Sequence, residues 1–235
     1  SPIADKTYLM DSMDISQNFK DLDVLESKLR DLLIHRDVNP HFQPIVKFSD
    51  MEVIGYEILG RISDESLPSN PSELLELAQS FGYDSELSAL FREVGVAIGR
   101  YLPGSPVLFV NTTPKEIYET DDLLESLKKI HDMAPSNRIV VEINEKAITT
   151  KNEMSMLRNG LEKLNIGLAF DDFGAGQTRL VELAKAPPDY LKFDASLIHE
   201  IHLAPKRLHQ MLSTFVKAAH DLGIGTLAEC IECSD

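Results

Sequence analysis

The sequence predicts an α/β protein built as a (β/α)8 barrel of the TIM type, with an antiparallel first strand and without its last β/α unit. Three observations lead to this prediction. Short apolar segments alternate with helix-like segments after residue 36. The first two apolar segments are too close together for a parallel crossover. Polar residues stand at the end of nearly every apolar segment.

Residues 1–36 differ from the rest and are expected to form an N-terminal linker or signalling helix, followed by one domain over residues 37–235. Apolar residues three and four positions apart mark one helix face: Ile15, Phe19, Leu22, Leu25, Leu29 and Leu32. Two interpretations are open. The helix could pack on the following domain, or it could be a signalling helix or coiled coil that extends from an upstream module.

The alternating segments predict the order of the sheet. Seven strands are expected, at residues 42–48, 52–59, 107–111, 139–143, 167–171, 190–193 and 224–229. Helices are expected at residues 72–80, 84–101, 115–131, 151–164, 178–185 and 205–221. This alternation is typical of βαβ units with a parallel sheet. The first two strands are joined by residues 49–51 alone, which predicts an antiparallel hairpin.

Nearly every predicted strand is apolar until its last residue or two, where it places a polar group. These groups are Glu57, Asn111, Glu142, Asp171, Asp172, Lys192, Asp194 and Glu229. Burying such groups singly would be costly. At the carboxyl ends of parallel strands they converge on one mouth, where α/β barrels build their active sites. No glycine-rich phosphate loop follows any strand, which disfavours an open doubly wound sheet.

The predicted mouth is rich in carboxylates. Against Lys192, with Arg61 nearby, stand eight acids: Glu57, Glu142, Glu145, Asp171, Asp172, Asp194, Glu229 and Glu232. Like charges this close destabilise a site, and divalent cations remove that penalty. Carboxylates with an Asn amide, and no His or Cys, favour Mg²⁺ or Mn²⁺ over zinc. Adjacent Asp171 and Asp172 could serve two ions, which clamp the attacking and leaving oxygens of a phosphodiester.

Seven short motifs occur in order between His41 and Asp235. They are F-Q-P-I-V from Phe42, Y-E-I-L-G-R from Tyr56, V-N from Val110, E-I-N-E from Glu142, D-D-F-G-A-G from Asp171, L-K-F-D from Leu191 and A-E-C-I-E from Ala228. In this order they resemble the EAL domain, the cyclic di-GMP-specific phosphodiesterase family of bacterial signalling. Ile58 stands where that family has the alanine of its name.

The resemblance implies residue roles. The implied metal ligands are Glu57, Asn111, Glu142, Asp171, Asp172 and Glu229. Lys192 would position the attacking water, Glu145 would brace the D-D-F-G loop, and Glu232 would support the last metal-binding loop. The implied substrate contacts are Gln43, Leu59, Arg61 and Asp194.

The resemblance also implies an activity, the hydrolysis of cyclic di-GMP to linear 5′-pGpG with two Mg²⁺ or Mn²⁺ ions and with Ca²⁺ inhibitory. It further implies a homodimer and an upstream regulatory domain. Two rival functions are a degenerate domain that binds cyclic di-GMP without cutting it, and an unrelated metal-dependent barrel hydrolase. Every implied ligand position before residue 235 is retained, which favours the enzyme.

Composition narrows the remaining possibilities. The net charge of −15 disfavours extensive electrostatic binding to DNA, RNA or anionic membranes. No apolar run has the roughly 20 residues of a membrane helix. Two cysteines, Cys230 and Cys233, fit a reducing bacterial cytoplasm, and their C-x-x-C spacing is interpreted as chance.

Three departures from the family pattern stand out. Residues 177–179 read Q-T-R where the family usually has Y-S-S, and Cys230 replaces a glycine. The residues from His41 to Asp235 amount to about one β/α unit less than a barrel requires. We therefore expect either that this chain is a truncated or partly ordered piece, or that another chain covers the gap. Intact-mass measurement would test the truncation.

Overall fold

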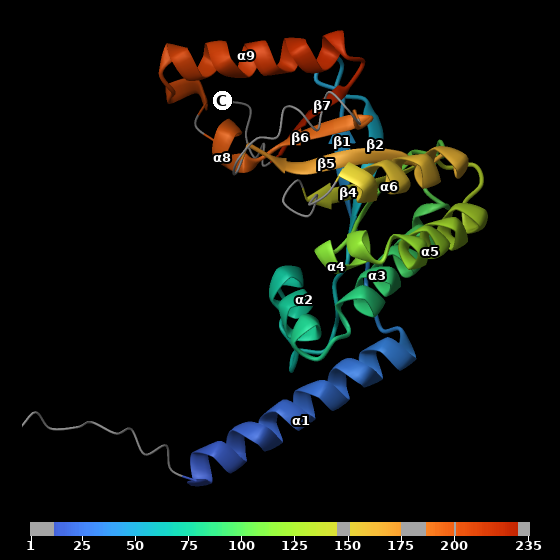
Figure 1. The fold of residues 1–235 in the computed structure, drawn as a ribbon, viewed down its shortest axis with the longest axis vertical. Coiled ribbons are helices and arrows are strands. Elements are labelled where there is room, and N and C mark those ends of the chain that lie inside the picture. The colour runs from blue at the N-terminus through green and yellow to red at the C-terminus, as the bar shows by residue number, and fades with distance from the viewer. Residues whose placement is uncertain (1–11, 145–150, 175–186, 200, 230–235) are drawn as a thin grey trace, which may run out of the picture.

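The computed structural model describes residues 12–144, 151–174, 187–199 and 201–229, and these contain one seven-stranded sheet (Figure 1). Its strands follow chain order: β1 (His41–Val46), β2 (Val53–Leu59), β3 (Val107–Asn111), β4 (Ile139–Asn144), β5 (Gly167–Phe173), β6 (Tyr190–Phe193) and β7 (Gly225–Ala228). The β1–β2 pair is antiparallel and every later pair is parallel. The predicted TIM-type α/β fold with an antiparallel first strand is confirmed, and the described residues contain the seven expected strands.

Helices separate most of the strands. They are α1 (Ser12–His35), α2 (Pro71–Ser80), α3 (Asp84–Gly99), α4 (Pro114–Tyr118), α5 (Thr120–Met133), α6 (Lys151–Lys163), α8 (Ala195–Ile198), the 3-10 helix η2 (Ile201–Leu203) and α9 (Lys206–Asp221). The helix expected at 178–185 lies outside the described residues. Among the helices that are described, none combines the length and apolar character needed to span a bilayer.

The helix expected at 115–131 is two helices, so that prediction was wrong in its detail. Pro114 begins α4, and Thr113 caps it by a capping box with Glu116. Glu119 leaves the helical conformation at φ −93° and ψ 50°. The Thr120 hydroxyl donates to the Ile117 carbonyl at 2.7 Å, a side-chain bond that competes with the helical ladder and bends the chain.

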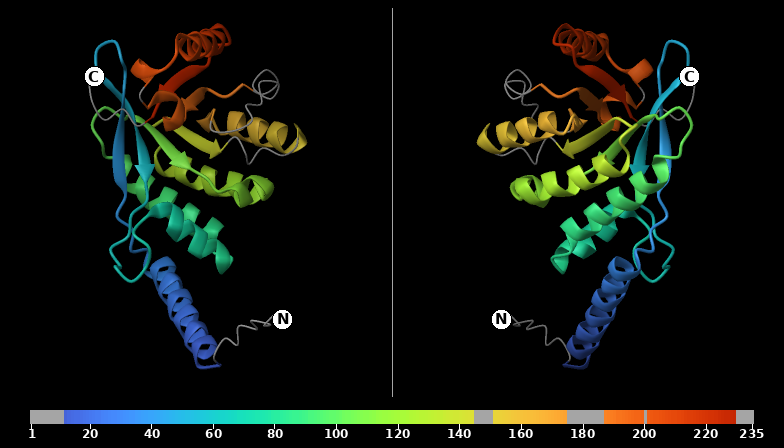
Figure 2. Two further views of the ribbon diagram at one scale, coloured as in Figure 1. Left: turned by 90° about the vertical axis from the view of Figure 1, so that its left-hand side faces the viewer. Right: turned by 90° about the vertical axis from the view of Figure 1, so that its right-hand side faces the viewer.

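The outer face of the sheet carries the main core. The helices lie along the outer side of the curved sheet (Figure 2). Side chains alternate along each strand, so one set faces the helices and the other faces the inside of the curve. Ile58, Val110, Val141 and Leu191 belong to the outer set and are buried with residues of the surrounding helices. At Gly95 of α3 a Cβ would lie 2.2 Å from Ile58, so the close approach of α3 to β2 requires glycine.

The inner face holds a small apolar layer that supports the strand ends. Phe109, Val140 and Ala169 are buried there. Four partly buried residues pack on this layer: Ile45, Val107, Tyr190 and Leu227. The rings of Phe109 and Tyr190 meet edge to face, with centroids 5.1 Å apart. Each strand's next inward-facing position lies at the mouth.

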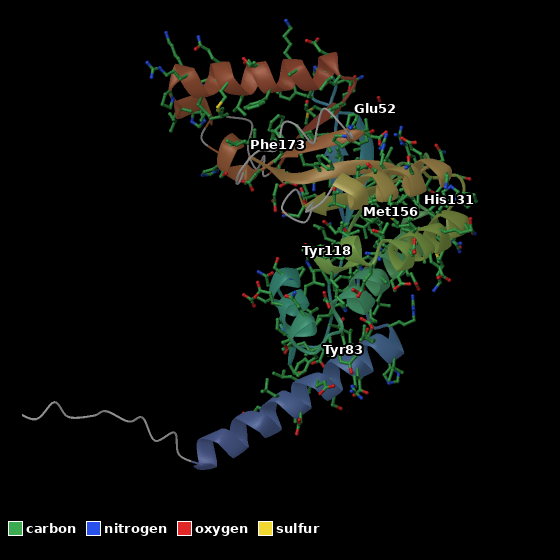
Figure 3. The ribbon with its side chains drawn as sticks, viewed as in Figure 1. Glu52, Tyr83, Tyr118, His131, Met156 and Phe173 are labelled. Atoms are coloured by element: carbon green, nitrogen blue, oxygen red, sulfur yellow. The ribbon has the colours of Figure 1, made fainter. Side chains whose placement is uncertain are left out.

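The second half of α1 packs on α2 and α3. Leu29 and Leu32 are buried among apolar residues of those helices. Tyr83 lies beside α1 (Figure 3). Arg30 lies over its ring, and its hydroxyl donates to Glu26 at 3.3 Å. Arg36 pairs with Glu93 of α3 at 2.8 Å. The division of the chain at residue 36 stays a prediction.

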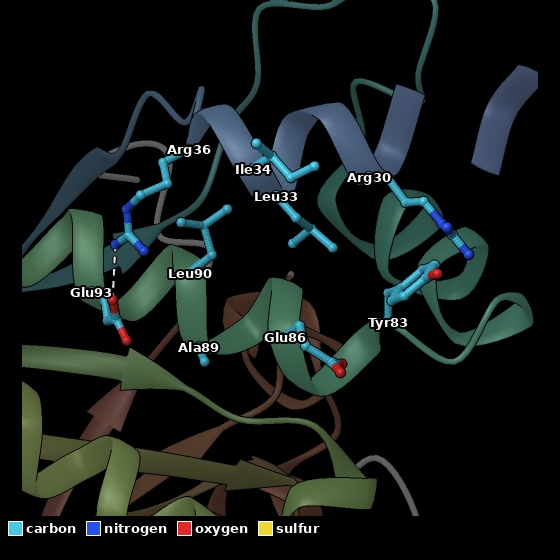
Figure 4. Close-up of a pocket in the computed structure, with 9 residues that line it drawn as sticks. All are labelled: Arg30, Leu33, Ile34, Arg36, Tyr83, Glu86, Ala89, Leu90 and Glu93. Atoms are coloured by element: carbon cyan, nitrogen blue, oxygen red, sulfur yellow. Dashed lines mark hydrogen bonds and ion pairs between the residues drawn. The ribbon is translucent and has the colours of Figure 1, made fainter. Parts of the chain in front are cut away.

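A groove of about 480 Å³ runs between α1 and α3 (Figure 4). Its lining residues are Arg30, Leu33, Ile34, Arg36, Tyr83, Glu86, Ala89, Leu90 and Glu93. None of the predicted site residues lines it, so this groove is not the candidate site.

Asp189 lies just before β6 and links the amino ends of β4, β5 and β6 by hydrogen bonds. Its carboxylate accepts from Arg138 and Arg158, each at 2.8 Å, and from the Leu168 N–H at 3.0 Å. Burial alone would raise the pKa of Asp189, but these hydrogen bonds and the positive charges outweigh it and lower that pKa. The carboxylate is therefore stabilised in its charged form.

Replacing Asp189 with Asn should lower the free energy of unfolding by about 1–2 kcal/mol near neutral pH, because charge-assisted bonds are lost. Because the folded-state pKa of Asp189 is depressed, its charged carboxylate stabilises the fold at pH values above the unfolded-state pKa of about 4. That stabilisation is lost as the pH falls through the folded-state pKa. In urea denaturation, the deficit of Asp189→Asn should therefore shrink toward about pH 3. The control is Glu162→Gln, an exposed partner of Arg158. Equal deficits in the two variants would contradict this account.

Candidate functional site

The strand ends bring six predicted site residues to one mouth. In five strands the polar residue lies two positions beyond an inner-layer residue, and the list is Asn111 after Phe109, Glu142 after Val140, Asp171 after Ala169, Lys192 after Tyr190 and Glu229 after Leu227. Glu57 lies two positions beyond Gly55 of β2. A step of two keeps a side chain on the same face of a strand. The alternation that builds the inner layer therefore also aims these polar groups inward.

Lys192 lies at the centre of the mouth and is 3% exposed. Its ammonium nitrogen contacts four carboxylates from four other strand ends: Glu229 Oε1 at 2.8 Å, Glu142 Oε2 at 3.0 Å, Asp171 Oδ1 at 3.0 Å and Glu57 Oε2 at 3.3 Å. One positive charge faces four carboxylates, so the cluster keeps an excess of negative charge.

The charges of this cluster shift one another's pKa. Burial by itself would lower the pKa of Lys192, but the four carboxylates outweigh burial and raise it, so the ammonium stays protonated. Burial raises the pKa of Glu142 well above its ordinary value, and the neighbouring Glu57 and Asp171 add to this against the opposing effect of Lys192. Burial likewise raises the pKa of Glu229. Additional positive charge would therefore stabilise the charged carboxylates of the site.

Asn111 ties the cluster to the neighbouring strands. Its side-chain nitrogen donates to Glu57 Oε1 at 3.1 Å. The next residue, Thr112, donates through its hydroxyl to the Glu142 carbonyl at 2.7 Å. Asn111 also pairs with Glu142 in the β3–β4 register. These contacts fix the amide of Asn111 beside two of the carboxylates.

A β-bulge turns two adjacent acids to the same side. The β5–β6 register shifts between Phe170 and Phe173, so β5 has one extra residue there. Asp172 has φ 56°, in the left-handed region that Asp tolerates better than most residues. Oxygen atoms of Asp171, Asp172 and Glu229 consequently lie within 4.8 Å of one another. In a regular strand the side chains of neighbouring residues would point to opposite faces.

The donors of this mouth fit a divalent cation that prefers oxygen ligands. Glu142 Oε1 is buried, and among the described atoms it has no hydrogen-bond partner. The grouped carboxylates carry more negative charge than Lys192 can balance. Carboxylate and amide oxygens are the ligands of Mg²⁺ and Mn²⁺. The residues that could hold such ions are Glu57, Asn111, Glu142, Asp171, Asp172 and Glu229.

Other predicted site residues lie at the same end of the sheet or outside the description. Gln43 is exposed and pairs in register with Glu57. Leu59 ends β2, and Arg61 donates to the Gly60 carbonyl at 2.9 Å. Asp194 caps α8 by accepting from the Ser196 N–H at 2.9 Å. Glu145, Glu232, both cysteines and residues 177–179 lie outside the described residues.

Sequence reasoning missed two polar residues of the mouth. Asn144 donates to Asp172, and Thr112 binds the Glu142 carbonyl. Asn144 could have been found, because it lies two residues beyond Glu142 and so shares its face. No strand-period signal marks Thr112, which follows the end of β3.

Comparison with known proteins agrees with this geometry. The sequence model of the EAL domain matches residues 26–235. The chain belongs to the EAL domain family. RocR of Pseudomonas aeruginosa, a cyclic di-GMP phosphodiesterase, is 27% identical over 205 residues, which are 83% of this chain and 51% of RocR. PdeB of Escherichia coli K12, a probable cyclic di-GMP phosphodiesterase, is 25% identical over 88% of this chain and 40% of PdeB. The chain therefore spans about half or less of these EAL relatives.

Solved EAL structures share the fold. BlrP1 of Klebsiella pneumoniae, in complex with calcium and cyclic di-GMP, is 26% identical with a TM-score of 0.74 over 83% of this chain and 50% of that chain. The manganese complex of BlrP1 is 25% identical with a TM-score of 0.71 over the same shares. The family and the fold implied by the seven motifs are thus confirmed.

Removing the Lys192 charge should destabilise the metal-free protein. Breaking a buried ion pair costs about 3–5 kcal/mol because the partner charges remain buried. Lys192→Met should therefore lower the free energy of unfolding by about 3 kcal/mol in EDTA, with part recovered in Mg²⁺. The control is Lys129→Met, whose side chain is 59% exposed in its pair with Glu93. Urea denaturation measures both, and equal small losses would show that Lys192 does not hold the cluster together.

Proposed function

We propose that this EAL domain is a metal-dependent phosphodiesterase that hydrolyses cyclic di-GMP to linear 5′-pGpG. The observation that carries the proposal is the mouth itself, where Lys192 contacts four carboxylates at once. Relatives named as cyclic di-GMP phosphodiesterases support the substrate. Water adds to phosphorus, the bond from phosphorus to the 3′-oxygen breaks, and the leaving oxygen takes a proton.

The metal ligands are proposed in two groups. Glu57, Asn111, Glu142 and Asp171 would hold one ion, and Asp171 with Asp172 and Glu229 would hold a second. When bound, divalent cations supply positive charge that neutralises phosphate oxygens and makes water a better nucleophile near neutral pH. The support is the orphaned Glu142 oxygen and the close grouping of Asp171, Asp172 and Glu229.

Lys192 is proposed to orient the attacking water rather than to deprotonate it. Its raised pKa keeps the ammonium protonated, so it donates hydrogen bonds and cannot act as a general base. A fixed positive charge in a buried site needs no reorganisation when charge develops at phosphorus, which is worth about 3–4 kcal/mol per group. Gln43, Leu59, Arg61 and Asp194 are proposed to contact the nucleotide, while Glu145 and Glu232 would brace the metal-binding loops.

A receptor that binds cyclic di-GMP without cleaving it is the rival function. A receptor has no need of metal ligands, and degenerate members of the family lose them. In this chain the acids, Asn111 and Lys192 are all present. We therefore favour the enzyme, and the assay described next distinguishes the two functions.

The direct test is incubation with cyclic di-GMP and Mg²⁺ or Mn²⁺, followed by chromatography of the product. We expect 5′-pGpG to accumulate, EDTA to stop the reaction, and excess Mg²⁺ to restore it. Ca²⁺ in place of Mg²⁺ should support no turnover. Tight binding of cyclic di-GMP without any product in either metal would refute the enzyme and favour the receptor.

Two substitutions separate metal binding from the electrostatic role of Lys192. Glu57→Ala should abolish turnover because a ligand is lost, and it should weaken Mn²⁺ binding. Lys192→Met should lower kcat by about 10² or more with Mn²⁺ binding largely kept. Asp132→Asn, an exposed acid on α5, is the charge control and should retain full activity. Unchanged rates in both site variants would overturn the assigned roles.

A further inference from the structure

A second buried ion pair joins α3 to α4, the short helix that follows β3. Arg92 of α3 is 1% exposed and Glu116 of α4 is 4% exposed. The pair is two-pronged, with Nη2 to Oε1 at 2.5 Å and Nη1 to Oε2 at 3.1 Å. A buried ion pair is weak evidence for stability, because desolvation offsets its Coulombic gain. Its other contacts point instead to a role in the site.

Arg92 and Glu116 hydrogen-bond to the backbone at Asn111 and at Thr113. Arg92 Nη1 donates to the Asn111 carbonyl at 3.1 Å as well as to Ser88 Oγ at 2.7 Å. Glu116 Oε2 accepts from the Thr113 N–H at 2.8 Å. The turn that leaves β3 is therefore held at its first carbonyl and again two residues later.

The restraint matters because Asn111 is the last residue of β3. Its side chain donates to Glu57 Oε1, so a rotation of the Asn111 backbone would move the amide away from that carboxylate. The amide oxygen lies on the same side-chain plane as the donating nitrogen. Fixing the backbone carbonyl of Asn111 therefore also restricts the direction in which the side-chain amide oxygen points.

We propose that Arg92 is a positioning residue for Asn111, and that it acts together with Glu116 to aim the Asn111 amide at the strand-end cluster. The inference rests on the proposed function, because it takes Asn111 as a metal ligand. Arginine suits this task because its fork binds the Glu116 carboxylate and the Asn111 carbonyl at the same time. The single nitrogen of lysine could neutralise Glu116 but could not reproduce the planar fork.

The test compares metal affinity with stability. Arg92→Lys keeps the charge that Glu116 requires and alters the contact with Asn111. The affinity of the free protein for Mn²⁺ is measured by electron paramagnetic resonance, without nucleotide, and the melting temperature is measured in EDTA. Loss of a residue that orients a metal ligand typically weakens binding about 10- to 100-fold. We expect Arg92→Lys to weaken Mn²⁺ binding by at least about tenfold.

Two controls separate positioning from stability. Ser126→Ala removes a hydroxyl that accepts from Arg92 Nη2 at 3.1 Å, a contact that does not reach Asn111. Asp189→Asn destabilises the opposite end of the strands. Both should lower the melting temperature and leave Mn²⁺ affinity within about twofold of wild type. If Arg92→Lys also stays within that range, the proposal is overturned.

The remaining outcomes are also decisive. If Arg92→Lys fails to fold, the double variant Arg92→Met with Glu116→Gln removes the contact without leaving a buried charge, and the same weakening is expected. A wild-type protein that takes up no Mn²⁺ overturns this inference. A wild-type protein that binds Mn²⁺ but does not cleave cyclic di-GMP refutes the proposed function alone, since the affinity comparison still tests Arg92.

Discussion

The contact of one lysine with four carboxylates is the constraint on which the mouth of this domain depends. Lys192 comes from β6, and its partners come from the ends of β2, β4, β5 and β7. Side chains from strands so far apart in a sheet can meet at one nitrogen only if the sheet curves around it. The curvature and the charge cluster therefore require each other. A flat sheet would leave these acids spread along an edge, where Lys192 could not contact all of them.

The same constraint explains why the inner face is apolar one step below the mouth and charged at it. Strand side chains repeat every two residues, so an inward apolar residue is followed two positions later by an inward polar one. Phe109 and Tyr190 pack edge to face in the apolar layer one step below the cluster. Low water content strengthens every interaction above that layer. Burial also raises the pKa of Glu142 in this cluster.

Much of this arrangement could be predicted from the sequence because it follows from strand period and charge. The strand ends, the antiparallel hairpin and the convergence of Glu142, Asp171 and Lys192 all come from local pattern. The break between α4 and α5 could not be predicted, because nothing in the sequence distinguishes Thr120 from an ordinary helical residue. Only the structure shows that its hydroxyl donates to the Ile117 carbonyl. The role of Arg92 was equally hidden, since a buried arginine in a helix cannot be distinguished by sequence from an exposed one. Tertiary partners decide both cases.

The bulge in β5 shapes both the hydrophobic core and the charge cluster at the mouth. A ladder without the extra residue would pair β5 and β6 more completely, and it would spare Asp172 a left-handed conformation. The bulge also serves the hydrophobic core, because Phe173 would share the inner face with Asp171 in a regular strand, whereas here it is buried in the main core beside Phe193 and Phe215. What the bulge adds is a second carboxylate on the inward side, close to Asp171 and Glu229. Asn144 donates to Asp172, but the added carboxylate still increases the negative charge of a cluster that already exceeds the charge of Lys192. The local strain and the added negative charge are both accounted for if positive ions occupy the mouth when the domain works.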